Sequence, residues 1–172
     1  MSATLRGLPP QIAPGCRALV LGSMPGDASL SAGQYYAHPR NRFWQLMGRL
    51  CGVDAGQSYE SRLHALHAAG IGLWDVIGEC QRSGSLDAAI VRGTEIPNPI
   101  AERLSDWPEL RVIAFNGGKA AEAFRRHLQP RLGLVLDRRR IALLPLPSTS
   151  PANAAFGLER LAEAWTPLRD CF

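Results

Sequence analysis

Short apolar runs alternate along the chain with longer segments in which apolar residues recur every three or four positions. Short runs bounded by glycine, proline or polar residues predict buried strands, whereas the longer spacing predicts helices with one buried face. The runs predict core strands at about residues 17–21, 71–76, 111–115 and 141–144. The longer spacing, together with prolines at 97 and 99, predicts helices at about residues 41–51, 58–69, 97–104, 121–128 and 158–168.

The helix expected at residues 58–69 has recognisable ends. Ser58 suits the N-cap position, where a hydroxyl accepts a hydrogen bond from a free backbone N–H, and Gly70 suits the end of the helix. His64 and His67 lie near its apolar stripe. We expect such histidines to be partly buried and hydrogen-bonded, and we assign them no part in a functional site.

Four remaining segments are expected to be mostly loops, at residues 5–14, 22–41, 78–93 and 130–140. Within them we expect at most a short helix at 86–91 and a small edge strand at 134–136. The alternation of strands and helices predicts an α/β protein with a mostly parallel sheet covered by helices on both faces. The length, 172 residues, fits a single domain that spans residues 1–172.

The charge of the chain suggests an anionic partner. The formal net charge is +4, and Lys119 is the only lysine among the 19 basic residues. Because arginine grips phosphates through paired donors, a polyanion such as DNA is a reasonable partner. The alternative is that arginine simply occupies solvated positions, and the charge alone does not decide between the two.

Several classes of protein are disfavoured by what the sequence lacks. No apolar run is long enough to cross a bilayer, and the N-terminus has no apolar signal segment, so we expect a soluble cytoplasmic monomer without membrane contact. The four cysteines form no C-x-x-C pair, and the four histidines have no metal-ligand spacing. We therefore expect no metal and no organic cofactor.

Three polar motifs follow predicted strands, and such strand ends open on one edge of a parallel sheet. The motifs are Gly22-Ser23-Met24-Pro25-Gly26, Tyr35-Tyr36-Ala37-His38-Pro39-Arg40-Asn41-Arg42-Phe43-Trp44 and Leu146-Pro147-Ser148-Thr149-Ser150-Pro151-Ala152-Asn153. In sequence and order they resemble those of the uracil-DNA glycosylase superfamily, and most closely those of hypoxanthine-DNA glycosylases, also called DNA-deoxyinosine glycosylases. The resemblance implies a three-layer α/β/α domain with a four-stranded sheet.

The resemblance also implies which residue acts in catalysis. Cleavage of a base from deoxyribose passes through an oxocarbenium-like sugar, so a glycosylase must stabilise a cation and position a water. Several branches of the superfamily orient that water with an Asp or Asn where this chain has Met24. By similarity to hypoxanthine-DNA glycosylases the role passes to Asn41, whose amide oxygen can hold the water. The alternatives are that Asn41 only caps the next helix, or that Asp27 acts, although we expect Asp27 to face solvent.

A flipped base must be held by stacking and by contacts to its edge. Gly22, Ser23 and Met24 are expected to line the base pocket. By similarity to mismatch-specific relatives, Tyr36 stacks on the base, with Tyr35 turned the opposite way; the alternative is that both rings only fill the loop. Asn116 ends the third strand, and its amide complements the N1–H and O6 of hypoxanthine. Uracil and thymine present the same pattern, so Asn116 excludes adenine and cytosine only.

The last motif and the lysine are expected to contact DNA. The second signature of the superfamily presses the minor groove and holds phosphates, which implies DNA contacts for Ser148, Thr149, Ser150, Pro151, Ala152 and Asn153. Lys119 opens a helix at which a phosphate could bind. The plain alternatives are an ordinary strand-to-helix loop and a glycine-assisted turn. Highly active uracil enzymes carry a histidine in this motif, and its absence disfavours efficient uracil removal.

These inferences predict a monofunctional DNA glycosylase of base excision repair. Its partner would be DNA that contains a deaminated base, with hypoxanthine as the preferred one. Two alternatives remain, a mismatch-specific uracil/thymine-DNA glycosylase and a non-catalytic nucleotide- or DNA-binding α/β module. A lyase that cleaves abasic sites would need an amine nucleophile, for which Lys119 is the only lysine.

Overall fold

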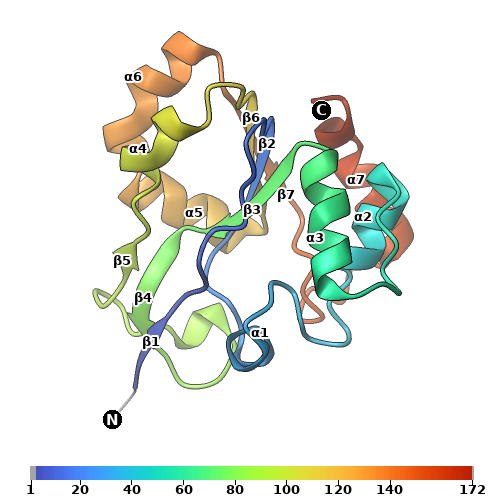
Figure 1. Cartoon of the computed structure of the whole chain (residues 1–172). Helices are drawn as coiled ribbons and strands as arrows, with labels where there is room; N and C mark the ends of the chain where they lie inside the picture. The colour runs from blue at the N-terminus through green and yellow to red at the C-terminus, as the bar shows by residue number, and fades with distance from the viewer. Residues whose placement is uncertain (1–2, 172) are drawn as a thin grey trace.

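The computed structural model describes residues 3–171 and contains a four-stranded parallel sheet at its centre (Figure 1). Its strands are β2 (Ala18–Gly22), β3 (Ile71–Asp75), β6 (Val112–Asn116) and β7 (Ala142–Leu146). The spatial order is β3-β2-β6-β7, so the first core strand pairs with a later strand on each side. Such a reversal of strand order opens a crevice at the carboxyl ends of the strands. The expected α/β fold and its four core strands are confirmed.

Helices cover both faces of this sheet and give the expected three layers. On one face lie α2 (Phe43–Cys51), α3 (Tyr59–Ala68) and α7 (Leu158–Arg169). On the other lie α4 (Ile100–Arg103), α5 (Gly118–His127) and α6 (Gln129–Arg139). Alternate residues of β2 point to opposite layers, because Val20 packs into one apolar cluster and Leu19 and Leu21 into the other.

The helices form where the apolar spacing predicted them. In α7, Leu161, Trp165 and Leu168 are fully buried, which confirms a core-facing stripe. The Ser58 hydroxyl accepts the Ser61 N–H at the start of α3, as expected of an N-cap. Next to this helix, His67 Nε2 lies 3.1 Å from the Gln11 carbonyl, in keeping with a structural role.

A second, antiparallel sheet was not expected from the sequence. It joins β1 (Thr4–Arg6), β4 (Ile77–Gln81) and β5 (Ile96–Pro97). The strands are too short for a clear alternation, and their pairing is set by contacts distant in sequence, as between Leu5 and Cys80. The short 3₁₀ helix η1 (Asp87–Ala89) lies inside the segment where a short helix was expected.

Three other expectations are corrected. Residues 130–140 are not a connection with an edge strand but helix α6, in which Leu132 and Leu136 are buried one turn apart while Leu134 is 74% exposed. The apolar run at 134–136 obscured this helical spacing. The loop after Gly22 contains the short helix α1 (Asp27–Ala32). Helix α4 begins only after Pro99 and continues as the 3₁₀ helix η2 (Leu104–Asp106).

No helix within residues 3–171 has both the length and the apolar character needed to span a membrane.

Candidate active site

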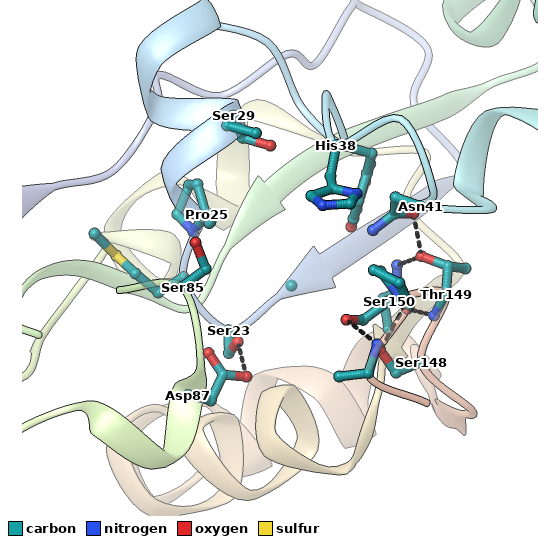
Figure 2. A pocket seen from close by; sticks show the side chains of 18 of the residues that line it. Ser23, Pro25, Ser29, His38, Asn41, Ser85, Asp87, Ser148, Thr149 and Ser150 are labelled. Atoms are coloured by element: carbon teal, nitrogen blue, oxygen red, sulfur yellow. Dashed lines mark hydrogen bonds between the residues drawn. The ribbon is translucent and has the colours of Figure 1, made fainter. Parts of the chain in front are cut away.

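A pocket of about 440 Å³ lies at the carboxyl ends of the core strands (Figure 2). This volume falls in the range typical of ligand sites. All three polar motifs contribute to its wall. Of the residues predicted for the site, those that line it are Gly22, Ser23, Met24, Tyr36, Asn41, Asn116, Ser148, Thr149, Ser150, Pro151 and Ala152. Lys119 and Asn153 are not among its lining residues.

The loop after β2 packs tightly against the end of β3. A Cβ atom at Gly22 would collide with the Asp75 carboxylate, so only glycine fits there. The next residue, Ser23, donates a 2.6 Å hydrogen bond from its hydroxyl to Asp87 of η1 (Figure 2). Met24 is buried and packs against Ile77, so it offers the pocket an apolar surface and no hydrogen-bonding group for water.

A hydrogen-bond network joins Asn41 to Asn116 through Thr149. The Thr149 hydroxyl donates to Asn41 Oδ1 at 2.9 Å and accepts from Asn116 Nδ2 at 3.0 Å. The Thr149 N–H also donates to Asn116 Oδ1 at 2.9 Å. Thr149 is fully buried, and these bonds hold side chains from distant parts of the sequence in one wall of the pocket.

The network changes the expected role of the Asn41 oxygen. Asn41 Oδ1 accepts the Phe43 N–H at 2.9 Å as well as the Thr149 hydroxyl, which occupies both of its lone pairs. The Phe43 N–H can only donate, so the amide orientation is fixed. The oxygen thus has no lone pair left for the expected water in this structure, so that role stays a prediction, and the bond to Phe43 matches the helix-capping alternative. The amide nitrogen lies on the pocket side (Figure 2).

The side-chain amide of Asn116 makes more hydrogen bonds within the protein than the sequence suggested. Both its amide oxygen and its amide nitrogen bond to Thr149, so Thr149 occupies the donor–acceptor edge that was expected to face the base. One N–H and one oxygen lone pair are left for other partners. Asn116 lines the pocket, and its contact with a base stays a prediction that involves these remaining groups.

The two tyrosines of the second motif point in different directions, as expected. Tyr35 is buried, and its hydroxyl donates to the carbonyl of Pro9 at 2.8 Å. Both tyrosines contribute to the pocket wall, and the ring of Tyr36 stacks on Phe43 at a centroid distance of 4.0 Å. Tyr36 also has a φ of 56°, a strained value for a residue with a side chain. This geometry agrees with Tyr36, rather than Tyr35, as the ring that would stack on a base.

Arg42 organises the loop of the third motif, and sequence reasoning gave it no role. Its guanidinium donates to the carbonyls of Ser150 at 2.7 Å, Asn153 at 3.0 Å and Phe156. The Asn153 side chain turns inward as well and donates to the Ser148 carbonyl at 3.0 Å. Asn153 therefore supports the loop from within, which leaves its expected contact with DNA without structural support.

Two carboxylic acids near the pocket differ in burial. Asp27 is exposed, as expected, and lies 3.6 Å from Arg82. Asp75, at the end of β3, is buried and lines the pocket. Burial and, to a smaller extent, the Asp87 carboxylate raise the pKa of Asp75 to about 7 against the opposing effect of the Arg82 guanidinium. The strand predicted at 71–76 placed Asp75 inside it, whereas β3 ends at Asp75; a carboxylic acid in an otherwise apolar run was the signal that could have found it.

Within residues 3–171, no three His, Cys, Asp or Glu side chains come together in a way that could hold a metal ion. That the protein works without a metal or an organic cofactor stays a prediction.

Comparisons with known proteins agree with this geometry. The family model described as the uracil DNA glycosylase superfamily matches residues 9–169. The chain belongs to this superfamily. Two hypoxanthine DNA glycosylases are similar to it. That of Methanosarcina barkeri is 42% identical over 118 residues, which cover 68% of this chain and 73% of the relative. That of Methanosarcina acetivorans is 38% identical over 160 residues, which cover 92% of this chain and 94% of the relative.

A solved structure supports the superfamily fold. The solution NMR structure of a candidate uracil DNA glycosylase from Methanosarcina acetivorans superposes with a TM-score of 0.78 at 34% identity and covers 97% of each chain. Lys119 is exposed, pairs with Glu122 at 3.5 Å and borders a second cavity of about 210 Å³, which shares Ser23 and Asp87 with the main pocket. The only lysine of the chain is thus not part of the main pocket, and its contact with a DNA phosphate stays a prediction.

Proposed function

We propose that this protein is a monofunctional DNA glycosylase that hydrolyses the N-glycosidic bond of hypoxanthine in DNA, as the first step of base excision repair. The observation that carries the proposal is the pocket in which Asn41, Thr149 and Asn116 are linked beside the apolar Met24. Membership of the superfamily supports glycosylase chemistry. Two relatives described as hypoxanthine DNA glycosylases support the choice of base.

The wall residues provide the contacts that a flipped base requires. Tyr36 offers a ring at the pocket surface, and the free N–H and lone pair of Asn116 are available to the base edge. Asn41 presents its amide N–H group, which can position a water by donating to one of its two lone pairs, so that the other lone pair is free to attack C1′ as the C1′–N bond breaks. A positioned group that acts only as the bond breaks lowers the barrier by its orientation.

DNA would bind across the mouth of the pocket. Ser148, Ser150 and Pro151 line this mouth and have small side chains, which allows the backbone to approach the duplex closely. Arg40 is exposed at the same place and can contact a phosphate. Since one chain supplies the whole pocket, we propose that the protein acts as a monomer, and we place it in the cytoplasm with the DNA that it repairs.

Hydrolysis is favoured over lyase chemistry because the only lysine lies outside the residues that line the pocket. A lyase forms a Schiff base between an amine and the abasic sugar, which borohydride reduces to a stable adduct. Hydrolysis uses water instead and leaves no covalent enzyme–DNA species.

The test is single-turnover incubation of the purified protein with a duplex that carries one deoxyinosine. The expected result is free hypoxanthine and an abasic site, in the presence of a chelator, with no borohydride adduct. Lys119→Arg is a matched variant that keeps the charge and is expected to release the base at the wild-type rate. An adduct that Lys119→Arg abolishes would identify a lyase, and binding without release of any base would identify a non-catalytic DNA-binding module.

A further inference from the structure

Asp75 is a buried carboxylic acid in the pocket wall to which the mechanism above gives no part. The residue is 4% exposed, and its Oδ1 packs against Gly22. Within the described part of the chain, Oδ2 is buried and has no hydrogen-bond partner. Unpaired polar atoms in protein interiors are rare, and this one belongs to the carboxyl group of a residue that lines the pocket, which suggests that a ligand there supplies the partner.

The backbone fixes where this carboxyl group lies. Asp75 is paired with Gly22 in the parallel ladder between β3 and β2. Its carbonyl accepts a hydrogen bond from the Asn98 side chain at 2.8 Å. Rigid strands position functional groups better than loops do. The carboxyl group therefore stands at a fixed place in the pocket wall.

The groups around Asp75 favour its protonated form. Asp87, whose side chain is held by Ser23, faces it from η1 and opposes a second negative charge. Arg82 has the opposite effect but donates to the carbonyls of Pro25 at 2.7 Å and Gly84 at 2.6 Å.

Two tyrosine hydroxyls from the second motif complete the surroundings. That of Tyr36 is buried and lacks a partner within residues 3–171, and that of Tyr35 is bound to the Pro9 carbonyl. Burial raises the pKa of Tyr36 above its ordinary value, so neither the tyrosines nor the amide of Asn116 brings a charge. Because the Asp75 carboxyl group is buried and no cationic side chain is hydrogen-bonded to it, its neutral form is favoured.

We infer that Asp75 is a second catalytic residue, which in its neutral form donates its proton to N7 of the flipped purine as the glycosidic bond breaks. This inference rests on the proposed function. The C1′–N9 bond breaks and its electron pair passes to the purine ring, while the Asp75 proton forms the N7–H bond. Water adds to C1′ and loses a proton to solvent, and Asp75 regains a proton from solvent. The sum is hydrolysis to a neutral base and an abasic sugar, without a co-reactant.

The inference also accounts for a choice of base that the amide of Asn116 does not provide. Hypoxanthine bound through N9 has a lone pair on N7. Uracil and thymine have no such atom, because N1 is bonded to the sugar and N3 carries a hydrogen. An acid placed to meet a ring nitrogen therefore assists a purine and gives no such help to a pyrimidine. A pKa of about 7 suits an acid that works near neutral pH.

The experiment compares single-turnover release from deoxyinosine and 7-deaza-2′-deoxyinosine duplexes by the wild type and Asp75→Asn between pH 5 and 9. On deoxyinosine, the wild-type rate should fall about tenfold per pH unit above the pKa of the acid. Asp75→Asn should be slower by about 10²–10⁴-fold at low pH and should lack this fall. The 7-deaza substrate has a C–H in place of N7, so both proteins should release its base equally slowly and without the fall. The exposed Asp137→Asn is the matched control and should behave as the wild type.

Three results would overturn the inference. The first is that Asp75→Asn releases base at the wild-type rate and with the wild-type pH profile. The second is that Asp75→Asn lowers the rate of release equally on both substrates. The third is that the wild-type rate still falls with rising pH on the 7-deaza duplex. The last comparison uses only the wild type, so it decides the matter even if circular dichroism shows that Asp75→Asn does not fold. Wild-type protein that releases no base from deoxyinosine would instead refute the proposed function itself.

Discussion

Replacing Thr149 with valine should uncouple the two asparagines of the pocket wall. Valine keeps the shape of threonine but lacks the hydroxyl that donates to Asn41 and accepts from Asn116. Each lost hydrogen bond has a net value of about 1 kcal/mol, so the free energy of unfolding should fall by about 2 kcal/mol. For a domain of this size that lowers the melting temperature by roughly 4–8 °C.

The substitution should also slow catalysis. With one fewer bond to its oxygen, the Asn41 amide is free to turn, and a transition-state contact weakened by about 2 kcal/mol lowers the rate roughly 30-fold. Single-turnover release from a deoxyinosine duplex measures this loss. Thr149→Ser is the matched control, because it keeps the hydroxyl and should retain most of the rate while losing some stability with its methyl group.

A double-mutant cycle makes the test specific to Asn41. If Thr149 acts through Asn41, then Thr149→Val should cost little more in rate once Asn41 is already alanine. The reasoning is refuted if Thr149→Val releases base within about twofold of the wild-type rate at a temperature where both are folded. It is refuted equally if the full loss recurs in the Asn41→Ala background.

Three further predictions follow from contacts in the same region. Asn41→Ala should lose about 10²–10³-fold in single-turnover release while DNA binding, measured by fluorescence anisotropy, stays near normal; near-normal release would leave Asn41 as a helix cap only. Arg42→Met removes three bonds to loop carbonyls and should weaken DNA binding and speed proteolysis of residues 148–156, and a loop as resistant as in the wild type would contradict this. Asp75 holds a proton in the folded state up to a pKa of about 7, whereas the unfolded carboxyl loses it near 3.8, so wild-type stability should decline between about pH 4 and 7. Asp75→Asn has no such group, so its free energy of unfolding relative to the wild type should rise by up to about 4 kcal/mol between pH 4 and 7, as measured by urea denaturation. The same pH dependence of stability in both proteins would refute a raised pKa for Asp75.

Much of the fold could be predicted because each core element carries its own periodic signal. The runs that form β2 and β6 are apolar on both faces, since both faces are covered, and the stripe of α7 is buried at Leu161, Trp165 and Leu168. The small antiparallel sheet escaped prediction because β1 and β5 have three and two residues, too few for a period, and exist through pairing with β4. Helix α6 was missed because its exposed face carries Leu134 and Val135, which with Leu136 form a continuous apolar run of the kind typical of a strand.

The candidate site could be located from the sequence, but the partners of its atoms could not. Polar residues at strand ends correctly indicated one edge of the sheet, and the structure places Asn41 and Asn116 in the same wall there. Whether the Asn41 oxygen keeps a free lone pair depends on Thr149, 108 positions away. The burial of Asp75 likewise depends on the surrounding loops rather than on its neighbours in sequence.

The most direct test of the account is the identity of the base that the pocket releases. Equal amounts of four duplexes, with deoxyinosine, deoxyxanthosine, deoxyuridine and mispaired thymidine, would be incubated separately with excess protein, and the free base measured by mass spectrometry over time. Hypoxanthine should be released fastest, and uracil and thymine should lag well behind. Faster release of uracil or thymine, or release of no base from any duplex, would contradict it.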